Sequence, residues 1–268
     1  MRIKAFRNLI YGHYASHKRD LPWRRTKDPY RILVSEIMLQ QTQVSRVIEK
    51  YKLFVRKFPA IRSLAKAPFQ DVLLAWQGLG YNRRALLLHR SAKRIVFEYN
   101  GVIPAQRERL RDLPGIGEAT SGEIMAFAFD KPVVFIETNI RSVFIHHFFP
   151  RRRSVSDAEL LPFIERTLDK KHPRRWYYAL MDYGVFLKAS IANPGRKSRH
   201  YALQSKFKGS DRQIRGMILN LMVKRKAVSL NSLLRTLDSD KDRLRKLVSG
   251  LCREGLLLRQ GASLSIAR

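Results

Sequence analysis

The sequence predicts a mainly α-helical protein that ends in a small α+β domain. Through residue 205, apolar side chains recur at helical spacing, proline or glycine separates most of the stretches, and alternating strand patterns are scarce. After residue 205, short helical stretches are followed by a hairpin pattern. With 268 residues and 45% hydrophobic content, the chain can bury a sizeable core.

The helical stretches follow one another closely along the chain. An apolar helical period occupies residues 30–58 and ends at Phe58-Pro59, because a residue before proline disfavours helical backbone angles. Further helices are predicted at 61–76, 83–99, 106–112, 117–129, 137–148, 157–169 and 173–187.

The last part of the chain has a different pattern. Residues 188–208 contain six Lys or Arg and no acidic residue, which predicts a basic loop or linker. Helices are then expected at about 211–224, 228–236 and 240–254, followed by a hairpin turning at Gln260-Gly261. Three helices and a small hairpin indicate a winged-helix-like domain at 206–268. A helical protein–protein module is the alternative.

The charge of the sequence indicates a polyanionic partner. Lys and Arg number 53 against 22 Asp and Glu, which gives a formal net charge of +31. No apolar run approaches the ~20 residues that span a bilayer, and no signal-peptide pattern follows the first residues. These features favour nucleic acid over a membrane, and the third helix of a winged helix would then contact DNA.

Cysteine usage restricts the kinds of site that the chain can form. Cys252 is the single cysteine, so it forms no intramolecular disulfide and cannot by itself assemble a cysteine-rich zinc or iron–sulfur site. We therefore expect a reducing compartment, the cytoplasm of a prokaryote, with the protein associated with the nucleoid.

The segment Leu113-Pro114-Gly115-Ile116-Gly117 lies between two predicted helices. Its two glycines let the backbone adopt positive φ and come close to another molecule, and the next helix offers free N–H groups. This pattern favours a hairpin that binds a DNA phosphate, and an alkali cation at the hairpin backbone is compatible with it. An ordinary turn between helices is the alternative.

Two glutamates are candidates for acid–base chemistry. Glu36 lies within an apolar helical period, where partial burial would raise its pKa and let it deliver a proton; the alternative is a surface glutamate at a helix edge. Glu137 follows four large apolar residues, so it is either a charge near a helix N-terminus or a carboxylate directed into a cleft.

These motifs together resemble the helix-hairpin-helix DNA glycosylase superfamily. The resemblance is carried by Leu21-Pro22-Trp23, SEIMLQQTQV at 35–44, Gly78-Leu79-Gly80-Tyr81, the hairpin LPGIG at 113–117 and Glu137-Thr138-Asn139. It covers roughly residues 5–190, and it is strongest toward the MutY family of adenine glycosylases. The implied fold has two helical lobes, at about 22–133 and at 1–21 plus 134–205, with a flipped nucleotide bound in the cleft.

The resemblance also implies roles for individual residues. Glu36 matches the general acid that protonates adenine, Glu137 matches the superfamily's aspartate, which stabilises the sugar cation and helps to manage the water, and Asn139 would support Glu137. Other positions match residues that contact DNA or the substrate. They are the base-stack wedges Gln41 and Tyr81, the hairpin residues Leu113, Gly115 and Gly117, and Arg19, Leu21, Trp23 and Asp182 around the adenine pocket. For Trp23 the alternative is core packing.

Ala119 stands where bifunctional relatives carry a lysine nucleophile, and alanine cannot form a Schiff base. The implied enzyme is a monofunctional hydrolase of base excision repair that removes adenine opposite 8-oxoguanine or guanine and leaves an abasic site. The alternatives are a thymine or uracil mismatch glycosylase and a non-catalytic protein that binds DNA lesions. The expected partner is double-stranded DNA with a mismatch or an oxidised base, and the expected state is a monomer.

Three features depart from the family pattern. One cysteine cannot hold the usual four-cysteine cluster, so no cofactor or metal is expected, and basic residues would replace the cluster's DNA contacts: Lys188, Arg196, Lys197 and Arg199. Glu137 is one methylene longer than the usual aspartate. The chain is also too short for a Nudix-like domain that reads 8-oxoguanine, and the winged-helix-like domain stands in its place.

Overall fold

The computed structural model describes residues 2–204, 206–225 and 227–267. The chain forms two compact units. Unit 1 comprises Met1–Glu36, Pro104–Asp112 and Ile116–Leu203, and unit 2 comprises Ile37–Ile103, Leu113–Gly115 and Gln204–Arg268. These units divide the chain differently from the predicted lobes, and the predicted boundary residue 205 lies outside the described residues.

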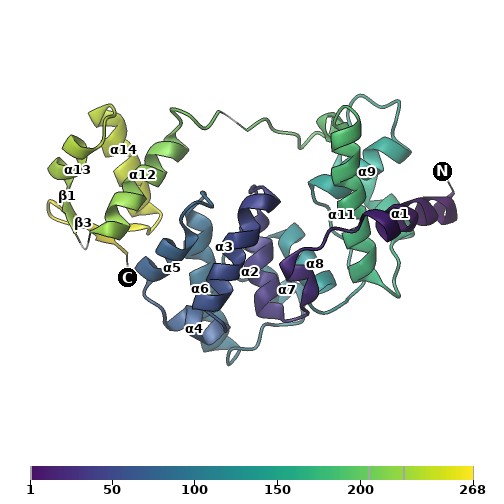
Figure 1. Ribbon diagram of the computed structural model, residues 1–268, viewed down its shortest axis with the longest axis horizontal. Coiled ribbons are helices and arrows are strands. Elements are labelled where there is room, and N and C mark those ends of the chain that lie inside the picture. The colour runs from purple at the N-terminus through teal and green to yellow at the C-terminus, as the bar shows by residue number, and fades with distance from the viewer. Residues whose placement is uncertain (1, 205, 226, 268) are drawn as a thin grey trace. The chain divides into compact units, whose positions relative to one another are not determined.

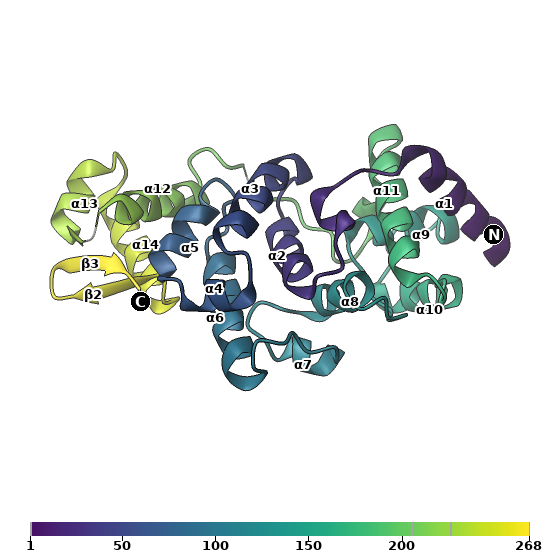
Figure 2. The same cartoon turned by 60° about the horizontal axis from the view of Figure 1, so that its bottom comes forward.

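Unit 1 is helical. Its elements are α1 (Ile3–His17), the 3-10 turn η1 (Pro22–Arg25), most of α2 (Pro29–Leu39), α7 (Arg107–Arg111), α8 (Glu118–Phe127), α9 (Thr138–Phe148), α10 (Asp157–Thr167), α11 (Pro173–Ser190) and the 3-10 turn η2 (Pro194–Lys197). Helices α1, α9 and α11 lie side by side in both views (Figures 1 and 2). Their shared core is aromatic, because the ring of Phe6 packs edge-on against Phe144 at 5.3 Å and against Trp176 at 6.0 Å.

Unit 2 combines a helical part with the C-terminal α+β part. The helical part contains α3 (Val44–Lys57), α4 (Ile61–Lys66), α5 (Phe69–Trp76) and α6 (Arg83–Glu98). The C-terminal part contains α12 (Asp211–Lys224), β1 (Val228–Ser229), α13 (Leu230–Thr236), α14 (Lys241–Arg253), β2 (Leu257–Gln260) and β3 (Ser263–Ile266). Gln70 of α5 donates a hydrogen bond to the carbonyl of Val223 in α12 at 2.9 Å, which joins the two parts.

The C-terminal part confirms the predicted winged-helix-like arrangement. Its strands form an antiparallel sheet in the order β1-β3-β2, with Leu257 opposite Ile266 and Gln260 opposite Ser263. Gly261 adopts φ +59° in the hairpin turn, as the Gln260-Gly261 pattern predicts. Helix α14 contributes Leu244, Val248 and Leu251 to the buried core under this sheet.

Two predicted helices are each two helices in the structure. The period at 30–58 is interrupted after Leu39, where Gln41 adopts φ 55° and α3 begins only at Val44. The stretch at 61–76 breaks at Pro68, which lacks an N–H group and precedes α5. Helix α1 was not predicted, because only Phe6 and Ile10 form its buried face and the apolar period is correspondingly weak.

The prediction of an unpacked basic loop at 188–208 is wrong for its first half. Lys188 belongs to the last turn of α11. Pro194 and Gly195 of η2 are buried, and the side chain of Asn193 accepts a hydrogen bond from the Gly195 N–H at 2.9 Å. The strand-like pairing of Val155 with Ser198 further fixes this segment in unit 1.

Among the described residues, no helix is long and apolar enough to cross a membrane.

Close contact between α9 and α11 requires glycine at position 184. A Cβ atom added to Gly184 would lie 2.7 Å from both the Cβ and the carbonyl oxygen of Asn139. Gly184→Ala should therefore push the two helices apart and lower the free energy of unfolding by about 1–3 kcal/mol. Chemical denaturation measures this change.

Gly12→Ala is the matched control, because a Cβ atom there meets nothing within 4 Å in helix α1 of the same unit. It should stabilise the protein by roughly 0.5–1 kcal/mol through helix propensity. Equal effects of the two substitutions would contradict the close-packing argument.

Candidate active site

Glu36 is buried, with 5% of its surface exposed. Helix α2 has buried side chains on all sides, among them Ile32, Leu33 and Ile37, so a charge on this helix loses its hydration. Burial is the main reason that the pKa of Glu36 rises to about 7; the Ser35 hydrogen bond and Arg24 lower it, and Glu137 raises it further. The surface-glutamate alternative is wrong, and the predicted rise in pKa is confirmed.

Ser35 lies beside this carboxyl group. Its Oγ is 2.8 Å from the Ile32 carbonyl oxygen and 3.1 Å from Glu36 Oε1. The hydroxyl group has one proton, so the Ile32 carbonyl oxygen and Glu36 Oε1 compete for it as acceptors. When Ser35 donates to Glu36, it stabilises the carboxylate and so lowers the pKa of Glu36, against the larger effect of burial.

Glu137 is the N-cap residue of α9. Its Oε1 accepts a hydrogen bond from the Ile140 N–H at 2.7 Å, and its Oε2 accepts bonds from Asn139 Nδ2 at 3.0 Å and Thr138 Oγ1 at 3.2 Å. Three donors and the positive end of the helix dipole stabilise a negative carboxylate. The helix-cap interpretation is confirmed, and so is the predicted hydrogen bond from Asn139.

Glu123 of α8 is a third acid in the same unit, and the sequence analysis missed it. Burial raises its pKa well above the ordinary value, and the charges of Glu36 and Glu137 raise it further. The available signal was its position as the one acidic residue in the stretch 119–129, which is otherwise small or apolar.

Asp182 of α11 organises two arginines. Arg24 of η1 binds it in a bidentate pair with two 2.8 Å hydrogen bonds, and Arg19 donates from its backbone N–H at 3.0 Å and from Nε at 2.5 Å. The pair with Arg24 is buried, and these contacts hold the pKa of Asp182 below its usual value although burial opposes them. The structure therefore brings the predicted residues Arg19 and Asp182 together.

Arg24 was not predicted, and it connects this ion pair to the acids. Its charge lowers the pKa of Glu36, and its guanidinium carbon lies 4.4 Å from the ring centroid of Tyr178. The Tyr178 ring stacks on Phe127 at 4.3 Å. Trp23, next to Arg24 in η1, is 2% exposed, as the core-packing alternative expects, and Leu21 is buried as well.

Lys188 interacts electrostatically with Glu137. Burial lowers its pKa, the charge of Glu137 raises it, and Arg19 lowers it. The prediction that Lys188 lies in a loop is wrong, because it belongs to the last turn of α11, and its contact with DNA stays a prediction. Arg196 and Arg199 are exposed on the segment that follows, while Lys197 donates to the carbonyl of Pro150 at 2.8 Å.

The glycines of the hairpin have different conformations. Gly115 adopts φ +83°, and an added Cβ atom would lie 2.9 Å from Leu87 Cβ. Gly117 has φ −98° and caps α8, so only Gly115 uses the positive φ that the two glycines allow. An added Cβ at Gly117 meets nothing within 4 Å, so its backbone is open to approach. Leu113 is buried.

Gln41 and Tyr81, the predicted wedges, both lie in unit 2 and both have positive φ, 55° and 46°. The buried guanidinium of Arg84 fixes the two turns that carry them. Its Nη1 donates to the carbonyls of Ile37 and Met38 at 2.9 Å each and to that of Gln40, and its Nη2 donates to Thr42 Oγ1 at 2.8 Å and to Gly80 O at 3.2 Å. Arg84 was not predicted.

In the described part of the chain, no group of three or more His, Cys, Asp or Glu side chains is arranged to hold a metal ion. Ala119, at the position of the lysine nucleophile in bifunctional relatives, lies in the first turn of α8.

The fold is similar to that of the helix-hairpin-helix class of DNA glycosylases. Residues 34–162 match the family model of the HhH-GPD superfamily base excision DNA repair protein. A thermostable thymine-DNA glycosylase shares the fold with a TM-score of 0.64 and 27% identity over 72% of this chain and 90% of its own. An endonuclease III trapped on DNA shares the fold with a TM-score of 0.61 and 17% identity, over 73% of this chain and 96% of its own. The predicted fold class is confirmed.

Within the superfamily, the sequence is similar to adenine DNA glycosylases. The enzyme of that name from Mycobacterium tuberculosis (strain ATCC 25618 / H37Rv) is 44% identical over 137 residues, which cover 51% of this chain and 45% of that protein. The adenine DNA glycosylase from Rattus norvegicus is 32% identical over 234 residues, which cover 81% of this chain and 44% of that protein. The chain spans about half the length of the curated relatives that it matches. The predicted resemblance is confirmed.

The pKa of Glu36 predicts a pH-dependent stability. Below pH 4.5 the group is protonated in both the folded and the unfolded chain; as the pH rises toward 7, the unfolded chain loses this proton and the folded chain keeps it. Relative to the Glu36→Gln variant, the wild-type protein should therefore lose on the order of 3 kcal/mol between pH 4.5 and 7.

Urea denaturation of both proteins between pH 4.5 and 8 measures this difference. The Glu98→Gln variant is the control, because Glu98 forms an exposed pair with Arg94. Parallel pH curves for wild type and Glu36→Gln would contradict the raised pKa.

Proposed function

We propose that this protein is a monofunctional DNA glycosylase that hydrolytically removes a mispaired adenine from duplex DNA and leaves an abasic site. The observation that carries the proposal is the difference between two acids in one unit. Glu36 is buried and has a pKa of about 7, while Glu137 is held as a carboxylate by three hydrogen-bond donors.

The two acids suit the two halves of the reaction. Glu36 donates its proton to a ring nitrogen of adenine, and the C1′–N bond breaks with its electron pair going to the protonated base. Glu137 stabilises the positive charge that develops on the sugar. Water then adds to C1′ and gives its proton to a carboxylate, so the products are adenine and an abasic sugar.

Asn139 is placed to help with the water. Its Nδ2 binds Glu137, and its buried Oδ1 has no hydrogen-bond partner among the described residues. A buried acceptor of this kind needs a donor, and a water molecule beside the sugar can supply one. Arg24, fixed by Asp182, completes the set by stabilising the charge of Glu36 after the proton has left.

Duplex DNA with a mismatch or an oxidised base is the proposed partner. The charge of +31 supports backbone binding, and the endonuclease III structures that share the fold were solved on DNA. We propose a monomer in a prokaryotic cytoplasm that works without a cofactor, because one cysteine cannot supply a four-cysteine cluster.

Removal of thymine is the second candidate, because a solved relative that is named a thymine-DNA glycosylase is 27% identical. Its chemistry would use the same two carboxylates with a different leaving base.

A panel of duplexes distinguishes these functions. It contains A opposite 8-oxoguanine, A opposite G, T opposite G and U opposite G, and each is assayed for base release with and without alkali. We expect release of adenine only, with strand breaks only after alkali, since Ala119 cannot form a Schiff base. Release from the T or U duplexes would support the second candidate, and no release from any duplex would support a non-catalytic binder.

On the adenine duplexes, Glu36→Gln and Glu137→Ala should each lower the single-turnover rate by at least about 100-fold and retain duplex binding. Glu49→Gln is the control, because Glu49 is an exposed acid paired with Lys52. A normal rate for either site variant would remove that residue from the mechanism.

The rate of adenine release should also depend on pH. Glu36 acts in its protonated form, so the single-turnover rate should be constant at low pH and fall about tenfold per pH unit above pH 7. Single-turnover assays from pH 5.5 to 9 measure this profile. A rate that rises through pH 7 would show that the group acts as a base.

A further inference from the structure

The side chain of Tyr81 is held by the C-terminal segment of unit 2. Arg212, in the first turn of α12, donates from Nη1 to Tyr81 Oη at 2.8 Å, and its guanidinium carbon lies 5.7 Å from the ring centroid. The side-chain amide of Gln204 donates to the same hydroxyl oxygen. A phenol oxygen can accept both bonds, so two side chains from beyond residue 203 fix one aromatic ring.

Arg84 restrains the same residue from within the helical part of unit 2. Its guanidinium carbon lies 5.4 Å from the Tyr81 ring centroid, and its Nη2 holds the preceding carbonyl, that of Gly80. Tyr81 itself adopts φ 46°, a left-handed conformation that a bulky side chain rarely takes without support from its surroundings. The surrounding contacts therefore determine both the backbone and the ring of Tyr81.

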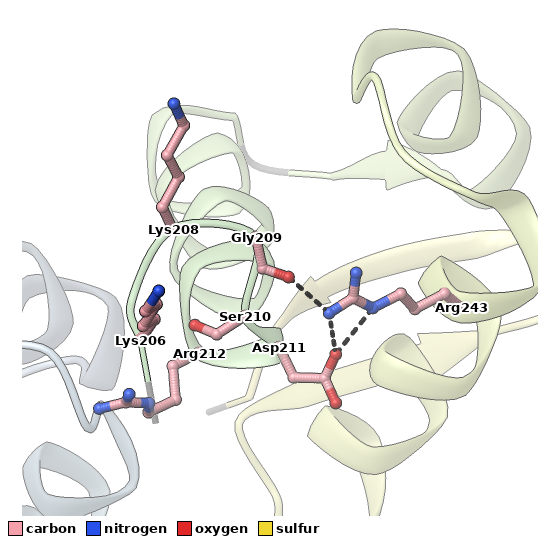
Figure 3. A pocket seen from close by; sticks show the side chains of 7 residues that line it. All are labelled: Lys206, Lys208, Gly209, Ser210, Asp211, Arg212 and Arg243. Atoms are coloured by element: carbon pink, nitrogen blue, oxygen red, sulfur yellow. Dashed lines mark hydrogen bonds and ion pairs between the residues drawn. The ribbon is translucent and has the colours of Figure 1, made fainter. Parts of the chain in front are cut away.

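The surface next to this contact is strongly basic. A cavity of about 460 Å³ at the start of α12 is lined by Lys206, Lys208, Arg212 and Arg243. Figure 3 shows that Arg243 reaches this cavity from α14 and binds Asp211 and the Gly209 carbonyl, whereas Lys206, Lys208 and Arg212 extend away from that pair. This charge suits the phosphates of a DNA strand beside Tyr81.

We propose that Arg212 and Gln204 are positioning residues that hold Tyr81 ready to insert into the DNA base stack, so that the C-terminal segment takes part in recognising the mismatch. The inference rests on the proposed function, because it takes Tyr81 as a residue that contacts DNA. A ring fixed before binding loses less conformational entropy when it inserts, so the contact should strengthen binding at a mismatch specifically. Simple charge attraction by Arg212 would strengthen binding to every duplex alike.

A pair of arginines on one helix separates the two effects. Arg212→Ala removes the Tyr81 contact and one charge, and Arg225→Ala removes one exposed charge at the other end of α12. Fluorescence anisotropy with the full chain gives the affinity for a duplex with A opposite 8-oxoguanine and for a fully paired duplex. Arg212→Ala should lower the preference for the mismatch by about tenfold, whereas Arg225→Ala should weaken both affinities equally.

Conservative variants test whether Arg212 acts through Tyr81. Tyr81→Phe keeps the ring and removes the hydroxyl group, and it should reduce the preference as Arg212→Ala does. The double variant should be no worse than either single one, and Arg212→Lys should recover part of the preference. Tyr81→Phe and Arg212→Lys nearly keep the size of the side chain. They can therefore test the proposal even if Arg212→Ala does not fold.

The outcomes separate this inference from the proposed function. Equal preferences in Arg212→Ala and Arg225→Ala, or additive effects of Tyr81→Phe and Arg212→Ala, would overturn the positioning role while the duplex panel still shows base release. If the wild-type protein releases no base, and Arg212→Ala still lowers the mismatch preference, the proposed function is overturned and the positioning role is kept. A wild-type protein without any mismatch preference would overturn both.

Discussion

The hydrogen bonds of the buried Arg84 guanidinium are the interaction on which the shape of the two turns that carry Gln41 and Tyr81 depends. The last carbonyls of a helix have no partner within the helix, and here one arginine donates to those of Ile37 and Met38 near the end of α2 and to that of Gln40 just after it. The same guanidinium donates to the carbonyl of Gly80. One charged side chain therefore fixes both the end of α2 and the turn before Tyr81. Burial lowers the pKa of Arg84 to about 10, which still leaves it protonated at neutral pH and able to donate to all its acceptors.

The candidate active site follows from two ways of placing a carboxylic acid. Glu36 lies near the C-terminal end of α2 among buried neighbours, where the backbone N–H groups are already bonded within the helix, and loss of hydration raises its pKa to about 7. Glu137 begins a helix, where free N–H groups and the side chain of Asn139 bind the anion. Burial therefore favours the protonated form of Glu36, whereas hydrogen bonds at the helix N-terminus favour the charged form of Glu137.

How much of the fold and of the candidate site could be predicted from the sequence depends on how far apart in the sequence the interacting residues lie. The Gln260-Gly261 hairpin was predicted because turn type is a local signal. Helical period and cap position made Glu36 and Glu137 candidates but left their alternatives open, and the family resemblance assigned their roles. The break at Gln40–Gln43 was not predicted, because it depends on Arg84, more than forty residues away. Arg24 and Glu123 were missed for the same reason: their importance comes from neighbours that only the folded chain brings close.

The segment after α11 is held in unit 1 by contacts with its own chain. Asn193 caps η2 through the Gly195 N–H, Gly195 fits against Ser142 with no room for a side chain, and Val155 exchanges backbone hydrogen bonds with the strand-like stretch up to Arg199. Each of these contacts is modest alone, and together they fix the backbone of the segment. They leave Arg196 and Arg199 exposed, so a firmly held segment presents two positive charges at the surface of unit 1.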